Sequence, residues 1–221
     1  MEPNELKNSL SSADKTYQKL EEMIVLTELK PGVMYTEKEL SELLKVGRTP
    51  VREALQRLSL EGLVNIIQRR GVQIAEVDAT IQLRLLEVRR VIQNLASVTA
   101  AQRATDNDRQ AMLTFARELE VSIEEGIPSR AHALLNVSTA FDLVMKASHN
   151  PYVDKTLGIV RGVSRRFWIY HLRRNDYAQG AQYYARLLRA VAGGDADEAT
   201  AASNALIDYL ETFARGTVDW E

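Results

Sequence analysis

The sequence contains no cysteine, which excludes disulfide bonds and thiol chemistry from any account of its stability or activity. It also has no apolar run that approaches the roughly 20 residues of a membrane-spanning helix. The first residues lack the basic start and apolar stretch of a secretory signal peptide. Together, these absences favour a protein of a reducing cytoplasm that has no membrane partner.

A strong net charge is absent as well, because the formal charge of the 221 residues is −2 at pH 7. This balance argues against a protein that is covered with nucleic acid over most of its surface. It does not argue against a local basic surface, because affinity for DNA depends on the charge of the binding patch and not on the net charge of the whole protein. No nucleophile elbow, phosphate-binding loop or metal-hydrolase motif is present, so we do not expect an enzyme. The length suits two compact domains, each with its own core.

The most informative stretch is 46–58, which predicts an amphipathic helix with one wet face. The apolar positions at helical spacing are Val51, Ala54, Leu55 and Leu58, and the wet positions are Arg48, Arg52, Gln56 and Arg57. Thr49 before Pro50 predicts an N-cap hydroxyl followed by proline at the first helical position. The free N–H groups and positive dipole at such a helix start suit a phosphate. A solvated surface helix is the alternative.

The segments around this stretch predict a winged helix-turn-helix. A helix at 36–44 opens with a Thr-x-x-Glu capping box. A three-residue turn with glycine, at 45–47, joins it to the next helix. Two β-branched runs at 63–67 and 72–75 flank a basic, glycine-containing turn at 68–71 and predict a hairpin.

The same segments resemble the GntR family of bacterial transcription regulators. The resemblance rests on ELSEL at 39–43, RTPVREAL at 48–55, leucine at 58, EGLV at 61–64 and RGV at 70–72. It implies that a first helix, expected at 15–29, supports the other two. Membership of this family implies sequence-specific binding to double-stranded operator DNA.

Seven residues are candidates for contact with DNA. Arg48 and Arg52 project from the start of the helix expected in the major groove, where arginine pairs with guanine O6 and N7. The expected backbone contacts are Lys38, Thr49 and Arg57. The family resemblance implies that Arg70 and Gly71, at the wing tip, approach the minor groove.

From residue 81 onward the sequence shows helical periodicity and no convincing strand. Six helices are expected at 81–103, 106–125, 129–148, 151–174, 177–193 and 195–216, and their short connections predict an antiparallel bundle. The fold class is therefore mainly α with a small β-hairpin wing. The expected parts are a flexible arm at 1–14, the winged domain at 15–76, a linker at 77–80 with Asp78 or Thr80 as N-cap, and the helical domain at 81–221.

This second half resembles the FCD effector domain of the FadR-like branch of the family. The resemblance rests on LEVRR at 86–90, AF at 140–141, HNP at 149–151, RRFW at 165–168 and AVAGGD at 190–195. It implies a divalent metal held by an acid and histidines beside a carboxylate ligand. Here the corresponding positions hold Ser138, Asp142, Tyr184 and either Leu206 or Asn204. Because zinc and similar ions favour imidazole, we expect no cofactor, with a metal retained at Asp142 as the alternative.

The loss of these histidines raises the question of which group holds an anionic effector. His132, His149 and His171 do not rebuild the set, because they fall on unrelated elements. Arg89 is the first candidate, since a guanidinium can grip a carboxylate through two hydrogen bonds; the alternative is that it extends outward. Arg165 or Arg166 is the next candidate cation; the alternative is that the two form a surface pair beside core aromatic residues. Neutral hydrogen bonds to the ligand are expected from Ser138, Tyr184 and Asn204. Asp142 is expected either to pair with one of these arginines or to select a ligand that carries hydrogen-bond donors.

These features predict a homodimeric, ligand-responsive transcription regulator that reads a palindromic site. The resemblance implies that it is a repressor controlled by a small organic acid. Two alternatives remain. One is an architectural DNA-binding dimer whose bundle only dimerises, and the other is a helical-bundle enzyme with an accessory DNA-binding domain.

Overall fold

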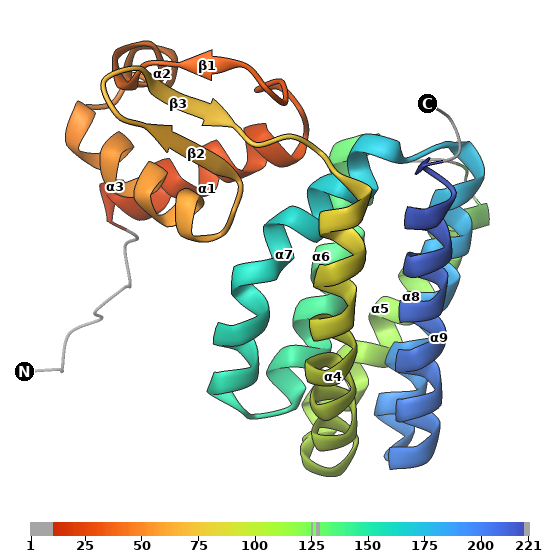
Figure 1. Ribbon diagram of the computed structural model, residues 1–221. Coiled ribbons are helices and arrows are strands. Elements are labelled where there is room, and N and C mark those ends of the chain that lie inside the picture. The colour runs from red at the N-terminus through yellow and green to blue at the C-terminus, as the bar shows by residue number, and fades with distance from the viewer. Residues whose placement is uncertain (1–10, 125, 127–128, 219–221) are drawn as a thin grey trace, which may run out of the picture. The chain divides into compact units, whose positions relative to one another are not determined.

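The structure, a computed structural model, describes residues 11–124, 126 and 129–218 (Figure 1). The chain divides into two compact units, Met1–Glu76 and Val77–Glu221, and each is described by itself. Among the helices of the described residues, none combines the length and the apolar content that crossing a membrane requires.

The first unit contains three helices and a small sheet. Its elements are α1 (Ser12–Val25), β1 (Met34–Tyr35), α2 (Glu37–Leu44), α3 (Arg48–Leu60), β2 (Val64–Ile67) and β3 (Gly71–Ile74). Helix α1 packs along α3, and α2 also packs against α3. The core includes Leu20, Ile24, Leu40, Leu55 and Leu58, which are almost fully buried. The prediction of a winged helix-turn-helix is confirmed.

Helix α1 begins earlier than the sequence predicted. Ser11 is its N-cap, and a capping box joins the Ser11 hydroxyl to the Asp14 N–H and the Asp14 carboxylate to the Ser11 N–H. The helix therefore starts inside the segment 1–14 that was expected to be a flexible arm, and residues 1–10 lie outside the described residues. It ends at Val25 and not near residue 29, because the chain turns at Thr27, where φ is 62°.

The sheet contains a strand that the sequence analysis missed. Strands β2 and β3 form the predicted hairpin, and β1 pairs antiparallel with the other edge of β3. Strand β1 has two residues, which is too short for any periodicity to indicate. The wing requires glycine where β3 begins: Gly71 has a φ of 122°, and a Cβ there would lie 2.4 Å from the carbonyl oxygen of Tyr35.

The predicted N-cap of α3 is wrong. Gly47 is the N-cap, with extended backbone, so Thr49 and Pro50 are the second and third residues of the helix. Proline is tolerated there because the N–H groups of the first helical turn have no intrahelical acceptor.

The second unit consists of helices within the part of the chain that the structure describes. They are α4 (Ala79–Arg103), α5 (Asp106–Glu124), α6 (Arg130–Ala147), α7 (Pro151–His171), α8 (Arg174–Gly193) and α9 (Ala196–Arg215). Helix α4 packs chiefly against α9, and α5 against α8 (Figure 1). Each of the six predicted helices has its counterpart here, so the prediction of a mainly α fold is confirmed.

Two boundaries of this unit differ from the sequence prediction. Helix α4 begins at Ala79, within the expected linker, because the Asp78 carboxylate accepts from the N–H groups of Thr80 and Ile81. The break between α7 and α8 falls at Leu172 and Arg173, which are both non-helical, and not at 175–176.

One arginine caps the C-terminal ends of two helices in this unit by donating hydrogen bonds to their last carbonyl groups. Arg109 Nη1 donates to the Ala192 carbonyl at 2.7 Å, and Nη2 donates to the Ala101 carbonyl at 2.8 Å. These carbonyls lie in the last turns of α8 and α4, where the helix lacks internal donors and its dipole favours a cation.

Replacing Arg109 with alanine is expected to lower the free energy of unfolding by about 1–3 kcal/mol, because both helix ends lose a charged donor. Urea denaturation followed by circular dichroism measures this change. Arg117→Ala is the control, since Arg117 is an exposed arginine on α5, the helix that also carries Arg109. A loss no greater than that of the control would show that the two contacts do not stabilise the unit.

Candidate nucleic-acid interface and internal cavity

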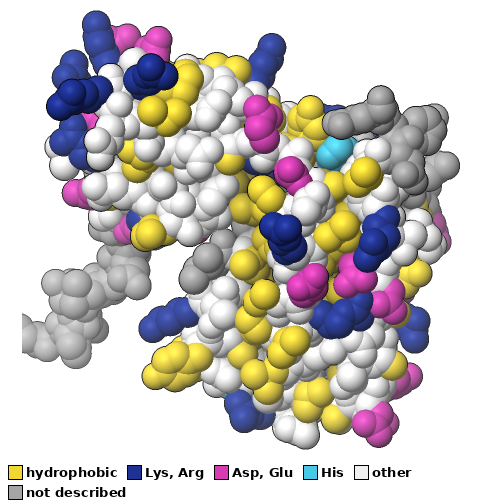
Figure 2. Space-filling model, in the orientation of Figure 1, with side chains coloured by type: hydrophobic (Ala, Val, Ile, Leu, Met, Phe, Trp, Pro, Cys, Tyr) yellow, Lys and Arg dark blue, Asp and Glu magenta, His cyan; other side chains and the backbone are white. Residues whose placement is uncertain are grey.

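The exposed side of α3 begins with two arginines. Arg48 and Arg52 stand about one helical turn apart, and both are exposed, as is Thr49. Gly47 is the N-cap and makes no side-chain hydrogen bond to the N–H groups of the first turn. Figure 2 shows several Lys and Arg side chains standing out from this unit. Cations beside a free helix start suit phosphate oxygens and base edges.

Arg52 is held side-on by Glu37 of α2. Its Nε donates to Glu37 Oε1 at 3.0 Å, and its Nη2 donates to Oε2 at 2.7 Å. The Arg52 guanidinium holds the pKa of the Glu37 carboxyl below its ordinary value. The contact leaves Nη1 and the second hydrogen of Nη2 for another acceptor, and the Arg52 side chain is 63% exposed. Arg52 is therefore oriented but still open to a base.

Arg57 lies on a different side of α3. Its Nη1 donates to the Asp14 carboxylate of α1 at 2.7 Å, and its guanidinium lies 4.0 Å from the centroid of the Tyr17 ring. Because it follows Arg52 by five residues, it points roughly 140° away from Arg52 around the helix axis. The predicted wet positions Arg48, Arg52, Gln56 and Arg57 are all exposed, but Arg57 lies at the edge of this surface that meets α1. The Arg57 side chain is 46% exposed, and its other N–H groups remain available for a contact with the DNA backbone.

The wing and α2 carry the remaining candidates for DNA contact. Arg70 is exposed in the turn between β2 and β3, and Gly71 follows it as the first residue of β3. Lys38 is exposed near the start of α2, with its Nζ 3.7 Å from the Glu42 carboxylate. An ion pair between two such exposed groups contributes little stability. Lys38 therefore remains available for contact with DNA.

A small cavity lies in the second unit between α4, α6, α7 and α8. Its lining residues are Arg89, Val137, Phe141, Leu157, Val160, Arg161, Ser164, Arg165 and Tyr184. The space between atoms, including the part open to solvent, is about 290 Å³, and the centre of a water molecule can move through about 20 Å³ of it. In this conformation the cavity has room for about one ordered water molecule.

Arg89 is the buried cation of this cavity, so its side chain turns inward and not outward. Its Nε donates to Gln93 Oε1 at 2.9 Å, its Nη1 to Ser164 Oγ at 3.0 Å, and its Nη2 to the Tyr184 hydroxyl at 3.0 Å. The guanidinium also lies 5.2 Å from the centroid of the Phe141 ring. All three acceptors are neutral, and no described residue forms an ion pair with Arg89.

The structure brings three more of the predicted residues to this cavity or beside it. Arg165 lines it and donates from Nη1 to the Ser138 hydroxyl at 2.9 Å. Asp142 forms an ion pair with Arg161, one turn before Arg165 on α7. The expected pairing of Asp142 with an arginine is thus present, but the arginine is one that the sequence analysis did not name.

Arg166 and Asn204 do not line the cavity. Arg166 is 2% exposed and lies on another side of α7. Asn204 Oδ1 accepts from Arg90 Nη1 at 3.3 Å and from Asn94 Nδ2 at 2.8 Å. Arg90 is one position after Arg89, the α4 residue that lines the cavity. Asn204 therefore faces a side of α4 that is about 100° away from the cavity around the helix axis. The assignment of Asn204 to the cavity by counting is therefore wrong.

Four lining residues of α7 were missed although their spacing is visible in the sequence: Leu157, Val160, Arg161 and Ser164. Together with Arg165, which was named, they recur at intervals of three and four residues, which places them on one face of α7. The spacing identifies the face, but only the packing of the neighbouring helices shows that this face meets the cavity.

The side chains at the family's metal positions do not suit a metal in this chain. Each of the polar side chains at these positions already accepts a hydrogen bond from an arginine: Asp142 from Arg161, Tyr184 from Arg89 and Ser138 from Arg165. Leu206, at one of the histidine positions, is buried and apolar. Imidazole ligands are missing from this set, and within the described ranges no three His, Cys, Asp or Glu side chains cluster as metal ligands do.

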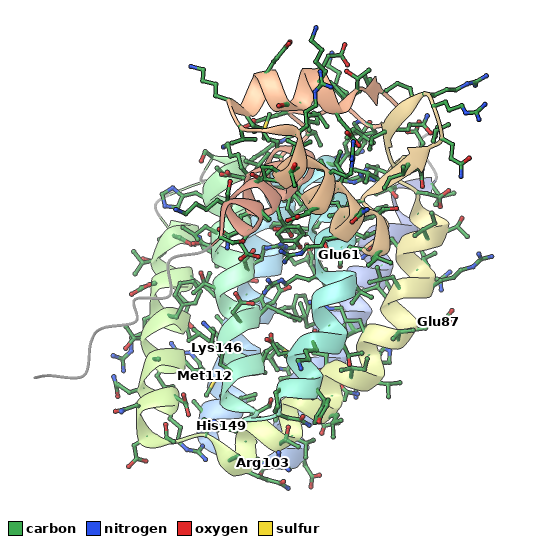
Figure 3. The ribbon with its side chains drawn as sticks, turned by 90° about the vertical axis from the view of Figure 1, so that its left-hand side faces the viewer. Glu61, Glu87, Arg103, Met112, Lys146 and His149 are labelled. Atoms are coloured by element: carbon green, nitrogen blue, oxygen red, sulfur yellow. The ribbon has the colours of Figure 1, made fainter. Side chains whose placement is uncertain are left out.

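The three histidines lie on separate elements. His132 is in the first turn of α6, and His149 follows that helix with its Nε2 3.0 Å from the Asp108 carboxylate. Figure 3 shows His149 at the same end of this unit as Arg103. His171 ends α7, where burial lowers its pKa. They form no common site.

Comparison with known proteins assigns a family to each unit. Residues 12–74 match the model of the bacterial regulatory proteins of the gntR family, and residues 84–209 match that of the FCD domain. The Nta operon transcriptional regulator of Aminobacter aminovorans is 32% identical over 163 residues, which is 71% of this chain and 74% of that protein. The transcriptional regulator LutR of Bacillus subtilis is 24% identical over 218 residues, covering 88% of this chain and 97% of that protein.

A solved structure supports the fold. That of McbR/YncC from E. coli has a TM-score of 0.78 at 19% identity and covers 95% of this chain and 99% of its own. Together with the exposed arginines at the start of α3 and the basic wing, the two family matches show that the chain belongs to the GntR family of DNA-binding transcriptional regulators and carries an FCD domain.

Proposed function

We propose that this regulator is a homodimeric repressor that releases its operator when a small organic acid binds in the cavity of the helical unit. The observation that carries the proposal is the buried Arg89 guanidinium with three neutral partners. A buried cation without a carboxylate partner is costly, because neutral acceptors compensate only part of its lost hydration. An anion bound beside it would supply the missing charge.

A hydrogen-bonded chain connects this cation to the start of α4. Ser164 Oγ accepts from Arg89 Nη1 at 3.0 Å and from Gln82 Nε2 at 3.2 Å. Gln82 lies in the first turns of α4, a few residues after the boundary between the two units. A ligand that draws Arg89 toward itself would therefore disturb contacts at the point where the helical unit joins the DNA-binding unit along the chain.

An apolar stripe on α4 supports the homodimer. Ile81, Val88 and Leu95 recur every seven residues, and Val91 lies between the last two. All four are exposed, Val91 to 70%. Figure 2 shows hydrophobic side chains among charged ones on the face of this unit where α4 lies in front. Packing α4 against a second copy of itself would remove this stripe from water.

The narrow cavity favours a second candidate function, an architectural DNA-binding dimer whose helical unit only dimerises. A thermal-shift screen with small organic acids distinguishes the two. At 100 times its Kd, a bound acid stabilises the folded protein by about 2.7 kcal/mol, which should raise the Tm by roughly 5–10 °C. The same acid should release operator DNA in an anisotropy assay. If no acid in a broad screen changes either quantity, the architectural function is the correct one.

A further inference from the structure

We infer that the effector is a monocarboxylic acid with an apolar body, bound through Arg89 without a metal ion. The inference rests on the proposed function, since it names the chemical class of ligand for the same cavity. It starts from the donors of Arg89. A guanidinium has five N–H groups, and the three hydrogen bonds to Gln93, Ser164 and Tyr184 use one on each nitrogen.

Two N–H groups of Arg89 therefore remain, one on each terminal nitrogen. Two N–H donors are the number that a bidentate contact between one guanidinium and one carboxylate uses, one for each oxygen. The three existing bonds, with Phe141 against the guanidinium, hold the group in place before any ligand arrives. A prearranged donor loses little side-chain entropy on binding.

The walls of the cavity determine what the rest of the ligand must be. Val137, Phe141, Leu157 and Val160 are lining residues with apolar side chains. The Ser164 and Tyr184 hydroxyls both accept from Arg89, so each keeps one O–H donor, and the carboxylate of Asp142 accepts from Arg161. A ligand with several hydroxyl groups would bury some of them without a partner, which is costly, whereas an aliphatic or aromatic body gains from burial.

A second carboxylate on the ligand would be unfavourable for the same reasons. Against the apolar walls or near Asp142 it would lack a cation, because Arg161 is already paired with Asp142. The remaining lining cation, Arg165, donates from Nη1 to the Ser138 hydroxyl, and the dicarboxylate used in the test probes that side. The small volume also restricts the ligand to a compact body and requires lining side chains to shift on entry. Arg161 is the lining residue suited to this movement, since its side chain is 33% exposed.

The test uses the full chain, dialysed against a chelator, in isothermal titration calorimetry. The probes are benzoate and 4-methylpentanoate, each with its neutral amide, and phthalate as a matched compound with a second carboxylate. We expect at least one monocarboxylate to bind, and its amide to bind about 10 to 100 times more weakly, because the amide lacks the negative charge that strengthens the hydrogen bonds from Arg89. Phthalate should bind more weakly than benzoate, because its second carboxylate would be buried away from water. Arg89→Met should reduce binding of the acid by a similar factor, and Arg117→Met, an exposed arginine on α5, should leave it unchanged.

The comparison of acid with amide on the unaltered protein stands even if Arg89→Met does not fold. The inference is overturned if amide and acid bind equally, if phthalate or a hydroxy acid such as lactate binds more tightly, or if binding needs added zinc. Those results would leave the proposed function intact, because an acid would still bind. Failure of every acid tested, polar or apolar, would overturn the proposed function as well.

Discussion

Glutamate in place of Val91 is expected to make the protein monomeric and to weaken its binding to a palindromic operator about 100- to 10,000-fold, because two linked DNA-binding units bind with a high effective concentration and one does not. Val91 is 70% exposed, so the substitution should leave the fold of each unit intact. In a dimer built on the α4 stripe, however, it would bury an unpaired charge at the interface. Light scattering measures the mass, and fluorescence anisotropy measures the affinity.

The matched control is Leu135→Glu, which places the same charge at an exposed apolar position on α6. This variant should remain dimeric and bind the operator as the unaltered protein does. If Val91→Glu stays dimeric at micromolar concentration, α4 is not the interface. If the unaltered protein is itself a monomer, the homodimer proposal fails.

Alanine in place of Arg48 or Arg52 is expected to cost about 1–3 kcal/mol of binding to the operator, because each variant would lose the proposed two-point contact with guanine in the major groove. Binding to random DNA should weaken less, since arginine contacts there are not base-specific. The measurement is anisotropy on both DNAs at one fixed salt concentration, because affinities at different salt concentrations cannot be compared.

Lys30→Ala serves as the control, since Lys30 is an exposed cation in the turn after α1 and lies outside the α3 surface. It should change neither affinity appreciably. Equal losses on operator and random DNA for Arg48→Ala and Arg52→Ala would show that these side chains contact phosphates and read no base.

The fold was predictable where one local signal dominates. The Thr36–Glu39 capping box marked the start of α2, and the periodicity after residue 81 marked the helices of the second unit. Local signals failed where several compete. The Thr49-Pro50 pair suits an N-cap, but Gly47 takes that place two residues earlier. Strand β1 forms because β3 offers it a free edge, which no pattern within two residues can reveal.

The cavity was predictable only in part because its contacts join distant segments. The spacing on α4 left open whether Arg89 turns inward, and Ser164 and Tyr184, which fix its direction, are 75 and 95 residues away. Counting along the chain placed Tyr184 correctly but misplaced Asn204, because a shift of one residue turns a helical side chain by about 100°. Arg161 was missed although it lies on the same face as Arg165, because the RRFW motif that pointed to Arg165 begins four residues later.

The Glu37–Arg52 pair has a consequence for how binding responds to salt. DNA binding is salt-dependent because each protein cation that neutralises a phosphate releases counterions from the duplex. In the proposed complex Arg52 would reach the DNA with its charge already balanced by Glu37, whereas no described residue forms an ion pair with Arg48. Arg52 would then contribute less than a full cation to the salt slope while keeping donors for a base. Part of the affinity for the operator would thus be separated from the electrostatic attraction to any duplex.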